Sequence, residues 1–536
     1  MKRVQLLDCT LRDGGYLVDA QFGNTVIKGM IKGLSESGID VVECGFLKDE
    51  PHQKGSTIFN NAAQLRPFLP EDRRQTSYVC LADYSRYTIS NLEPFDGTSI
   101  DGVRACFFKK ERYDVIDFCK SIVEKGYKLY VQPVDVLGYT DAELLELIEM
   151  INPLEPYAFS LVDTFGSMYK EDLRRVFYLV NQNLNAASRI GFHSHNNLQM
   201  SFSLSQEFID MTQGLRKIVI DGTMAGMGRG AGNTNTELIM QYMNRKYNSG
   251  YDIDTVLDLI DNYIDGIRNT CTWGYSIPYY LAGSYSAHVN NISYLTAKAG
   301  ISSRDINYIL NRIGGDARKR YDYDLLEKTY MEYVGIIRDD QKEVTKLRES
   351  LQGKDILMLL PGHSIVTHKD EILKYCEEKH PIVISVNLLS HDYPINYAYF
   401  SNKKRYNYWK SSSRFSEYKK IVTSNVTNEE NKNQVILDFT RLVKCGWDQL
   451  DNSGILLLRL LDELDVASIA MAGFDGYSHD ASSTNYMQKE MGKTRNTLNA
   501  DEANRDVQSM LEDYLNTRKS DCPLSFITPS RFELNH

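Results

Sequence analysis

Three clusters of polar residues have the types and spacing needed to hold a divalent cation. The pair Arg12-Asp13 follows an apolar run near the N-terminus, and two histidines lie two positions apart in His193-Ser194-His195. A glycine-rich segment, 226–233, ends in Asn233. Alternate residues of a strand point the same way, so the two imidazoles can face one side together. One Asp and two His, with water at the remaining positions, form an open site suited to Mn²⁺, Mg²⁺ or Fe²⁺, and histidine also permits Zn²⁺ or Co²⁺.

The elements that must position these clusters are short apolar runs that alternate with amphipathic stretches as far as residue 260. The runs predict eight strands, at Val4–Cys9, Val41–Phe46, Ser77–Ala82, Gly102–Phe108, Lys128–Val134, Tyr157–Asp163, Arg189–His195 and Lys217–Asp221. The clearest helical stretches are Asn24–Ser37, Tyr113–Lys125, Asp141–Ile151 and Lys170–Asn183. Repeated strand–helix units with apolar strands predict a closed (β/α)₈ TIM barrel over residues 1–262, with an open doubly wound sheet as the alternative. In such barrels the chemistry lies at the C-terminal ends of the strands, where all three clusters fall.

The remainder of the chain predicts a helical extension over residues 263–350 and a second α/β domain, Rossmann-like, over residues 351–536. Strands are expected at Ile356–Leu360, Pro381–Asn387, Val466–Ala472 and Leu524–Thr528. The turn Pro-Gly-His-Ser, with Gly362 and Ser364, joins a strand to a helix, where backbone N–H groups favour an anion such as phosphate. Asn387, Asn452 and Asp475 also lie at strand or helix ends, which line the ligand crevice of an open sheet.

Residues 397–420 alternate aromatic and basic side chains. That pattern predicts a surface loop or a lid, with stacking on bases and phosphates as the alternative. His363, His368 and His391 lack the spacing of metal ligands, so we interpret them as surface or turn residues.

Composition narrows the class of protein. The 536 residues carry a net charge of −10 with a pI of 5.6, which disfavours a general nucleic-acid binder. No apolar run approaches the roughly 20 residues that a membrane span requires. The nine cysteines form no C-x-x-C pair, and the N-terminus lacks a signal-peptide pattern. A reducing, cytoplasmic location is therefore expected, with the cysteines mostly acting as small buried hydrophobes.

The segments 8–15 (Asp-Cys-Thr-Leu-Arg-Asp-Gly-Gly), 193–197 (His-Ser-His-Asn-Asn) and 226–233 (Gly-Met-Gly-Arg-Gly-Ala-Gly-Asn) resemble the DRE-TIM metallolyase superfamily. The resemblance covers about the first 290 residues. It implies that Asp13, His193 and His195 bind the divalent metal, Mn²⁺ or Mg²⁺ before Zn²⁺ or Co²⁺, with Asn233 as a further ligand or second-shell group. It also implies three roles outside the metal ligands: Arg12 stabilises an enolate oxygen, Thr164 holds the substrate's carboxylate or carbonyl, and Glu43 faces the metal-bound water.

Within the superfamily, the segment 281–287 resembles the 4-hydroxy-2-oxo-acid aldolases, in which a tyrosine, here Tyr285, reaches the active site. The extension is likewise similar to the communication region of those aldolases. Those aldolases have a histidine three residues after the metal-binding Asp, and the lyase and synthase branches have glutamine, whereas this chain has Tyr16. The acid/base therefore stays open among Tyr16, Tyr285, His52 and His288, and Tyr16 could instead gate the mouth. The cysteine-bearing loop of the CoA lyases is absent from the glycine-rich segment.

Together these patterns predict a metal-dependent aldolase that joins or cleaves a 2-oxo acid, pyruvate, and an aldehyde through an enolate. The second domain loosely resembles domains of bacterial surface-glycan biosynthesis, which implies a nucleotide or phosphosugar ligand. The resemblance of the barrel to the DRE-TIM superfamily implies a homodimer. The alternatives are an acyl-CoA-dependent Claisen synthase and a non-catalytic scaffold.

Overall fold

In the computed structural model, residues 3–297, 301–334, 338–413, 415–444, 446–447, 452–479, 486–487 and 500–534 are described. The chain divides into two compact units, each with its own parallel sheet. One comprises residues 1–292 and 315–321, and the other comprises residues 293–314 and 322–536. The helical segment beyond residue 263 thus contributes to both units. Among the described residues no helix is long and apolar enough to cross a membrane.

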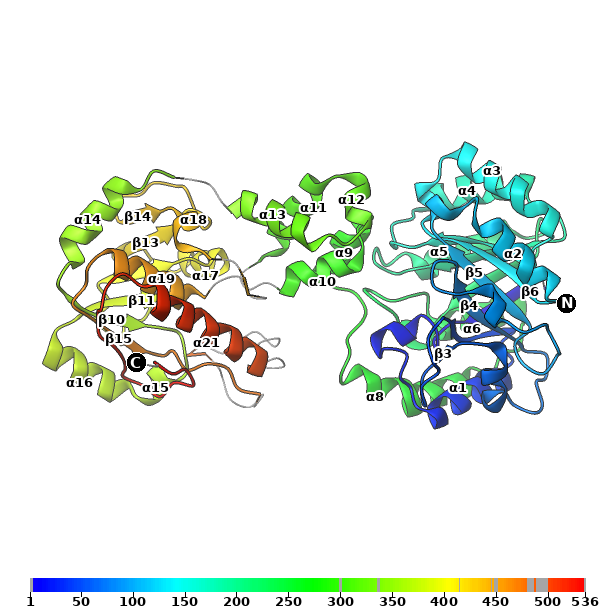
Figure 1. The fold of residues 1–536 in the computed structure, drawn as a ribbon, viewed down its shortest axis with the longest axis horizontal. Coiled ribbons are helices and arrows are strands. Elements are labelled where there is room, and N and C mark those ends of the chain that lie inside the picture. The colour runs from blue at the N-terminus through cyan, green and yellow to red at the C-terminus, as the bar shows by residue number, and fades with distance from the viewer. Residues whose placement is uncertain are drawn as a thin grey trace. The chain divides into compact units, whose positions relative to one another are not determined.

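The first unit is the predicted closed barrel of eight parallel strands (Figure 1). The first strand pairs with the last along the chain and also with the second, through Leu7 beside Val41, and this pairing closes the sheet. The barrel strands are β1 (Val4–Asp8), β2 (Val41–Leu47), β4 (Ser77–Asp83), β5 (Gly102–Phe107), β6 (Lys128–Pro133), β7 (Ala158–Asp163), β8 (Arg189–Ser194) and β9 (Ile218–Gly222), with β3 (Ile58–Phe59) appended to β2.

Helices cover most of the barrel: α1 (Asn24–Glu36), α2 (Val115–Glu124), α3 (Asp141–Ile151), α4 (Lys170–Asn183), α5 (Ser201–Met211), α6 (Thr236–Tyr247) and α7 (Ile253–Leu259). After β2 and β4 the cover consists of 3₁₀ turns, η2 (Ala62–Phe68) and η3 (Ile89–Asn91). Prolines at positions 67, 70 and 94 explain the lack of α-helix there, because proline removes a donor and clashes with the preceding turn. Farther along, α9 (Ile277–Ser284) packs through Gly283 against the barrel loop at Gly166 and Asn197.

The inside of the barrel changes from apolar to polar towards its C-terminal end. A buried layer of Leu7, Val41, Val79, Tyr130, Ala158 and Val219 fills the lower part. Two residues farther along four of these strands, the same inward face carries Glu43, Gln132, Ser160 and Asp221, all buried. Alternate residues of a strand point to the same face. The inward residues of the upper layer are therefore the ones that lie two positions after the apolar residues of the lower layer.

The second unit holds a parallel sheet of seven strands in the order β14-β13-β12-β11-β10-β15-β16. The chain starts at β10, winds outward to β14, and returns to the other side of β10, so the sheet is wound in both directions. Its strands are β10 (Asp355–Leu359), β11 (Ile382–Val386), β12 (Tyr397–Phe400), β13 (Lys419–Thr423), β14 (Gln434–Leu437), β15 (Ser468–Ala472) and β16 (Leu524–Phe526). Its longer helices are α11 (Ser303–Ile313), α13 (Tyr323–Val334), α14 (Gln341–Leu351), α16 (Lys369–Lys379), α17 (Lys403–Lys410), α19 (Ser453–Glu463) and α21 (Ala500–Thr517).

The prediction of a surface loop or lid for residues 397–420 is wrong. The segment forms β12, α17 and the start of β13. Tyr399 and Phe400 are fully buried, and Tyr406 packs edge-on against Phe400 with ring centroids 5.6 Å apart. The aromatic residues of the pattern therefore belong largely to the core of the sheet, and the basic residues lie between them.

Candidate functional site

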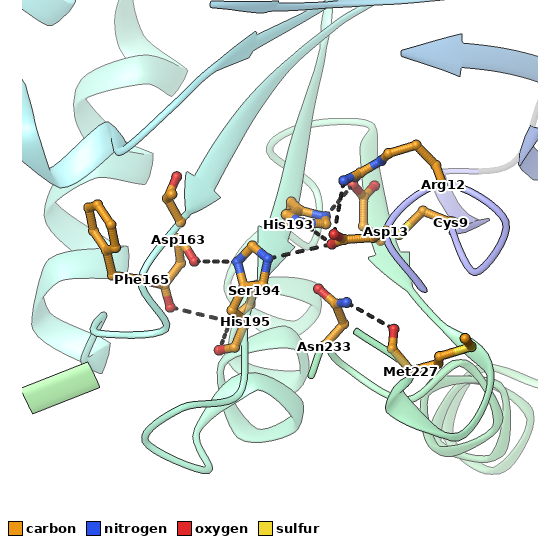
Figure 2. Close-up of polar contacts among 12 residues, drawn as sticks. Cys9, Arg12, Asp13, Asp163, Phe165, His193, Ser194, His195, Met227 and Asn233 are labelled. Atoms are coloured by element: carbon orange, nitrogen blue, oxygen red, sulfur yellow. Dashed lines mark hydrogen bonds and ion pairs between the residues drawn. The ribbon is translucent and has the colours of Figure 1, made fainter. Parts of the chain in front are cut away.

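The barrel brings Asp13, His193 and His195 together at its C-terminal mouth. The Nε2 atoms of His193 and His195 lie 3.2 Å and 3.5 Å from Oδ2 of Asp13. The two rings are nearly perpendicular, at 83°, with centroids 4.9 Å apart. Figure 2 shows both rings turned towards the Asp13 carboxylate. Two histidines from the end of β8 and one aspartate after β1 therefore meet at a single point.

The remaining ring nitrogens determine the histidine tautomers. Nδ1 of His193 lies 2.9 Å from a carboxylate oxygen of Asp221, and Nδ1 of His195 lies 2.9 Å from the backbone oxygen of Asp163. A carboxylate and a carbonyl only accept, so Nδ1 carries the proton in each ring. When Nε2 carries no proton, its lone pair faces the Asp13 carboxylate, an arrangement that a cation would stabilise. Ligands on adjacent corners of an octahedron with bonds of about 2.1 Å lie about 3 Å apart, close to the separations here.

Charges around Asp13 support the same interpretation. Burial favours the protonated acid, but Arg12, His193 and His195 together hold the pKa of Asp13 well below its ordinary value. Burial opposes a charge on His193 as well, yet Asp13 and Asp221 raise its pKa. In the absence of a metal, a proton on His193 supplies part of the positive charge that the carboxylates of Asp13 and Asp221 favour.

Asn233, the further predicted ligand, is 2% exposed and pairs through its backbone with His195. Its Nδ2 donates to the backbone oxygen of Met227 at 3.2 Å, while Oδ1 has no hydrogen-bond donor among the described residues. Cys9, which sequence reasoning treated as a packing residue, also offers Sγ within the same cluster as Asp13 and His193. Its thiol contacts the backbone oxygen of Gly222 at 3.3 Å, and burial raises its pKa well above the ordinary value. Cys9 lies two residues after Leu7 on the inward face, which is the signal that could have located it.

A buried network of charges supports the site from inside the barrel. Oε2 of Glu43 accepts from Nε of Arg12 and from a guanidinium nitrogen of Arg104, both at 2.8 Å. Arg104 also pairs with Asp221 and donates to Gln132 at 3.1 Å. Arg104, which is 1% exposed, is not among the residues predicted from the sequence. Oε2 of Glu43 thus positions Arg12, while its Oε1 has no donor among the described residues.

Tyr16 lies at the mouth, on the turn η1 (Gly14–Leu17), and is 37% exposed. Its ring meets Phe46 edge-on at 5.2 Å, and the guanidinium of Arg229 lies 3.9 Å from the ring centre. The surrounding protein raises the pKa of Tyr16, although Arg229 and Arg12 act in the opposite direction. At neutral pH the hydroxyl is therefore protonated, which suits a proton donor and not a base.

The other acid/base candidates have different surroundings. His288 is neutral at physiological pH, because burial and the nearby charge of Arg229 lower its pKa to about 4. The ring of Tyr285 lies under the guanidinium of Arg318, at 5.1 Å. His52 stacks on Phe59 with centroids 4.9 Å apart, and its Nδ1 lies 2.7 Å from a backbone oxygen beside it.

Thr164, the predicted substrate-binding hydroxyl, follows β7. Its Oγ1 accepts from the backbone N–H of Asp135 at 2.7 Å. This contact fixes the oxygen and leaves the hydroxyl proton to point to another acceptor.

The second unit contains a cavity of about 700 Å³ at the C-terminal ends of its strands. Four of the five predicted ligand residues line it, namely Gly362, Asn387, Asn452 and Asp475. Asn387 has a left-handed backbone, with φ of 53°, and its Nδ2 donates to Oγ of Ser453 at 2.8 Å. The cavity wall also includes Lys403, Arg405, Tyr477 and Tyr486.

The fifth predicted residue, Ser364, is not among the residues that line this cavity. Its backbone N–H donates to Oδ2 of Asp475 at 2.7 Å, and its hydroxyl pairs with Asp475 and with Thr528. The chain's own carboxylate therefore takes the place beside the strand–helix turn where the sequence predicts an anion. Gly362 is required there, because a Cβ would come within 2.4 Å of the backbone oxygen of Gly473.

The barrel is similar in sequence to proteins named as an aldolase and a decarboxylase. Residues 104–262 match the family described as HMGL-like. The chain is 27% identical over 330 residues to 4-hydroxy-2-oxovalerate aldolase of Pseudoalteromonas translucida, covering 58% of this chain and 91% of the relative. It is 28% identical over 311 residues to oxaloacetate decarboxylase of Mycobacterium tuberculosis, covering 55% and 88%. The crystal structure of hydroxymethylglutaryl-CoA lyase of Pseudomonas aeruginosa is 16% identical, with a TM-score of 0.40, and covers 49% of this chain and 93% of that one.

Proposed function

We propose that this chain, whose barrel carries an HMGL-like domain of the DRE-TIM metallolyase type, is a divalent-metal-dependent aldolase. Its substrates would be a 2-oxo acid, pyruvate, and an aldehyde. The observation that carries the proposal is the convergence of the Asp13 carboxylate and the two Nε2 atoms of His193 and His195 on one point. Asn233 Oδ1, buried without a donor among the described residues, is suited to the same cation as a ligand or through water.

Mn²⁺ or Mg²⁺ suits the oxygen-rich part of this set, and two imidazoles also accommodate Zn²⁺ or Co²⁺. When bound, such an ion supplies Lewis-acid stabilisation of the negative charge that develops on the 2-oxo oxygen. Arg12, held at Nε by Glu43, directs its outer N–H groups to the same charge. The Thr164 hydroxyl, its oxygen fixed by the Asp135 N–H, donates its proton to the substrate carboxylate.

Proton transfer at the acceptor carbonyl is the role we assign to Tyr16. Its hydroxyl is protonated at neutral pH and lies three residues from Asp13 at the mouth. In the condensation direction it gives a proton to the new alkoxide. Tyr285 is the alternative donor from the segment beyond the barrel.

Deuterium exchange at the pyruvate methyl group, followed by NMR, tests the proposal without knowledge of the aldehyde. We expect exchange with Mn²⁺, none with EDTA, and none in Asp13→Ala. Asp210→Ala is the matched control, since Asp210 bonds Lys246 on the outside of the barrel. Failure of the wild type to exchange with bound Mn²⁺ would exclude free pyruvate as the donor.

Two further assays separate the related reactions. Loss of CO₂ from oxaloacetate leaves the same enolate, and a relative named oxaloacetate decarboxylase makes this the second substrate to test. Release of free thiol from acetyl-CoA in the presence of a 2-oxo acid would instead identify a Claisen synthase.

For the second unit we propose a nucleotide or phosphosugar ligand, in the synthesis of a surface-glycan precursor. The support is the cavity of about 700 Å³, with Lys403 and Arg405 near the start of α17 and tyrosine rings in its wall. Cytidine monophosphate, uridine monophosphate and glucose 1-phosphate are the probes, measured by calorimetry on the full chain. Lys403→Glu should abolish binding, whereas the adjacent, exposed Lys404→Glu makes the same charge change outside the cavity and should retain it.

A further inference from the structure

Arg229 is a half-buried cation at the barrel mouth that lacks an acidic partner among the described residues. Two other cations there are neutralised by the protein itself. Arg12 contacts Asp13 and Glu43, and Lys319 lies 2.5 Å from Asp135. A guanidinium that is partly withdrawn from water without a counter-charge attracts an anion from outside the chain.

The backbone on both sides of Arg229 is fixed by close contacts. A Cβ on Gly228 would come within 2.3 Å of Nδ2 of Asn233. Gly230 has φ of +67°, and a Cβ there would come within 2.9 Å of Oδ1 of Asn197. The same buried amide oxygen accepts from the backbone N–H of Ala231 at 3.0 Å. Only glycine suits these two positions, so the loop presents the Arg229 side chain from a rigid base.

The guanidinium lies beside Tyr16, the residue proposed to donate a proton to the acceptor carbonyl. Its centre is 3.9 Å from the centre of the Tyr16 ring, and its charge lowers the pKa values of both Tyr16 and His288. A guanidinium stacked on a ring keeps its N–H donors in its own plane, where they can meet a carboxylate or a phosphate in a bidentate manner. The proton donor assigned to the acceptor carbonyl and an unpaired anion-binding group are therefore neighbours.

We propose that Arg229 selects acceptor aldehydes that carry a negatively charged group, a carboxylate or a phosphate. This inference rests on the proposed aldolase function and names the class of its second substrate. A charged hydrogen-bonded contact of this kind corresponds to a preference of about 10- to 150-fold in kcat/KM.

Matched pairs of acceptors test the inference with pyruvate and Mn²⁺. D-glyceraldehyde 3-phosphate is compared with D-glyceraldehyde, and succinic semialdehyde with butanal, so that each pair differs in its charged group. We expect the wild type to prefer the charged member of at least one pair, and the better pair identifies phosphate or carboxylate. Arg229→Met should remove the preference and retain methyl exchange of pyruvate, and Arg229→Lys should keep part of it.

Arg268→Met is the control, because Arg268 is also stacked on an aromatic ring, that of Trp273 at 4.9 Å, and donates to the backbone oxygen of Ala225. It should leave the preference unchanged. Two results would overturn the inference, provided that methyl exchange is observed. One is a wild type without preference for a charged acceptor, and the other is an Arg229→Met protein that keeps the preference. Absence of methyl exchange in the wild type with bound Mn²⁺ instead excludes free pyruvate as the donor and so contradicts the proposed function, which makes the two failures distinguishable.

Discussion

Removal of the Asp221 carboxylate should weaken metal binding without removing any metal ligand. One oxygen of Asp221, Oδ2, serves both Nδ1 of His193, at 2.9 Å, and a guanidinium nitrogen of Arg104. Asp221→Ala therefore frees the His193 ring to rotate and to change tautomer. Loss of such an outer-sphere partner lowers metal affinity by about 10- to 100-fold, which corresponds to about 1.4 to 2.7 kcal/mol.

The same substitution should lower the stability of the barrel. Breaking a buried ion pair by removal of one partner costs about 3 to 5 kcal/mol. Arg104 keeps its contacts with Glu43 at 2.8 Å and Gln132 at 3.1 Å, so we expect the lower end of that range. Asp221→Asn should be milder in both respects, because one amide oxygen can replace the single oxygen that accepts both contacts.

Calorimetric titration with Mn²⁺ and urea unfolding of the metal-free protein measure the two effects separately, since bound metal would otherwise add to the apparent stability. Asp210→Ala removes a carboxylate that bonds Tyr242, Lys246 and Tyr247 on the outside of the barrel, so it should leave the Mn²⁺ affinity unchanged and lower the stability less than Asp221→Ala does. A folded Asp221→Ala protein with the Mn²⁺ affinity of the wild type would refute the reasoning that Asp221 orients His193.

Three further changes test other parts of the structure. Burial raises the pKa of Asp8 to about 6, so the folded state prefers the protonated acid. The wild type should lose stability as pH rises from about 4 to about 6, and Asp8→Asn should show a smaller loss in urea unfolding across that range; part of the loss remains because burial raises the pKa of Asp163 to about 6 as well. Tyr16→Phe keeps the ring contacts with Phe46 and Arg229 but should slow aldol turnover by about 100-fold or more in steady-state assays, whereas unchanged turnover would assign Tyr16 to packing. Gly362→Ala should lower the melting temperature of the second unit by forcing its loops apart, with pyruvate exchange by the barrel unchanged.

Much of the barrel was predictable because its strands repeat with a period of two. The apolar runs located all eight strands, and the positions of Asp13, His193 and His195 at strand ends followed from the topology. The network of Arg104 with Glu43 and Asp221 was not found, although all three face inward in the upper layer. An arginine in an apolar run gives no sign of its partners, because those partners come from strands far away in the sequence.

The second unit was harder to predict for a related reason. Its strands β12 and β13 are short and carry Tyr, Lys and Thr, a composition that a loop also has. The buried faces of Tyr399 and Phe400 become apparent only when the neighbouring strands are in place. Local composition therefore gave the wrong structure where burial depends on pairing between distant segments.

The two sites also show when a local motif specifies a ligand. At the turn of Ser364 the sequence predicts an anion beside a helix start, but Asp475, 111 residues farther along the chain, already accepts from that N–H. At the barrel mouth the reverse holds. Arg12 contacts one oxygen of Asp13, at 3.2 Å, but the other oxygen, Oδ2, faces two imidazole nitrogens and has no hydrogen-bond partner among the described residues. A ligand is implied where the chain leaves charge or lone pairs uncompensated, and not wherever a motif could bind one. By the same reasoning Arg229 indicates an anionic substrate group, whereas Lys319, paired with Asp135, does not.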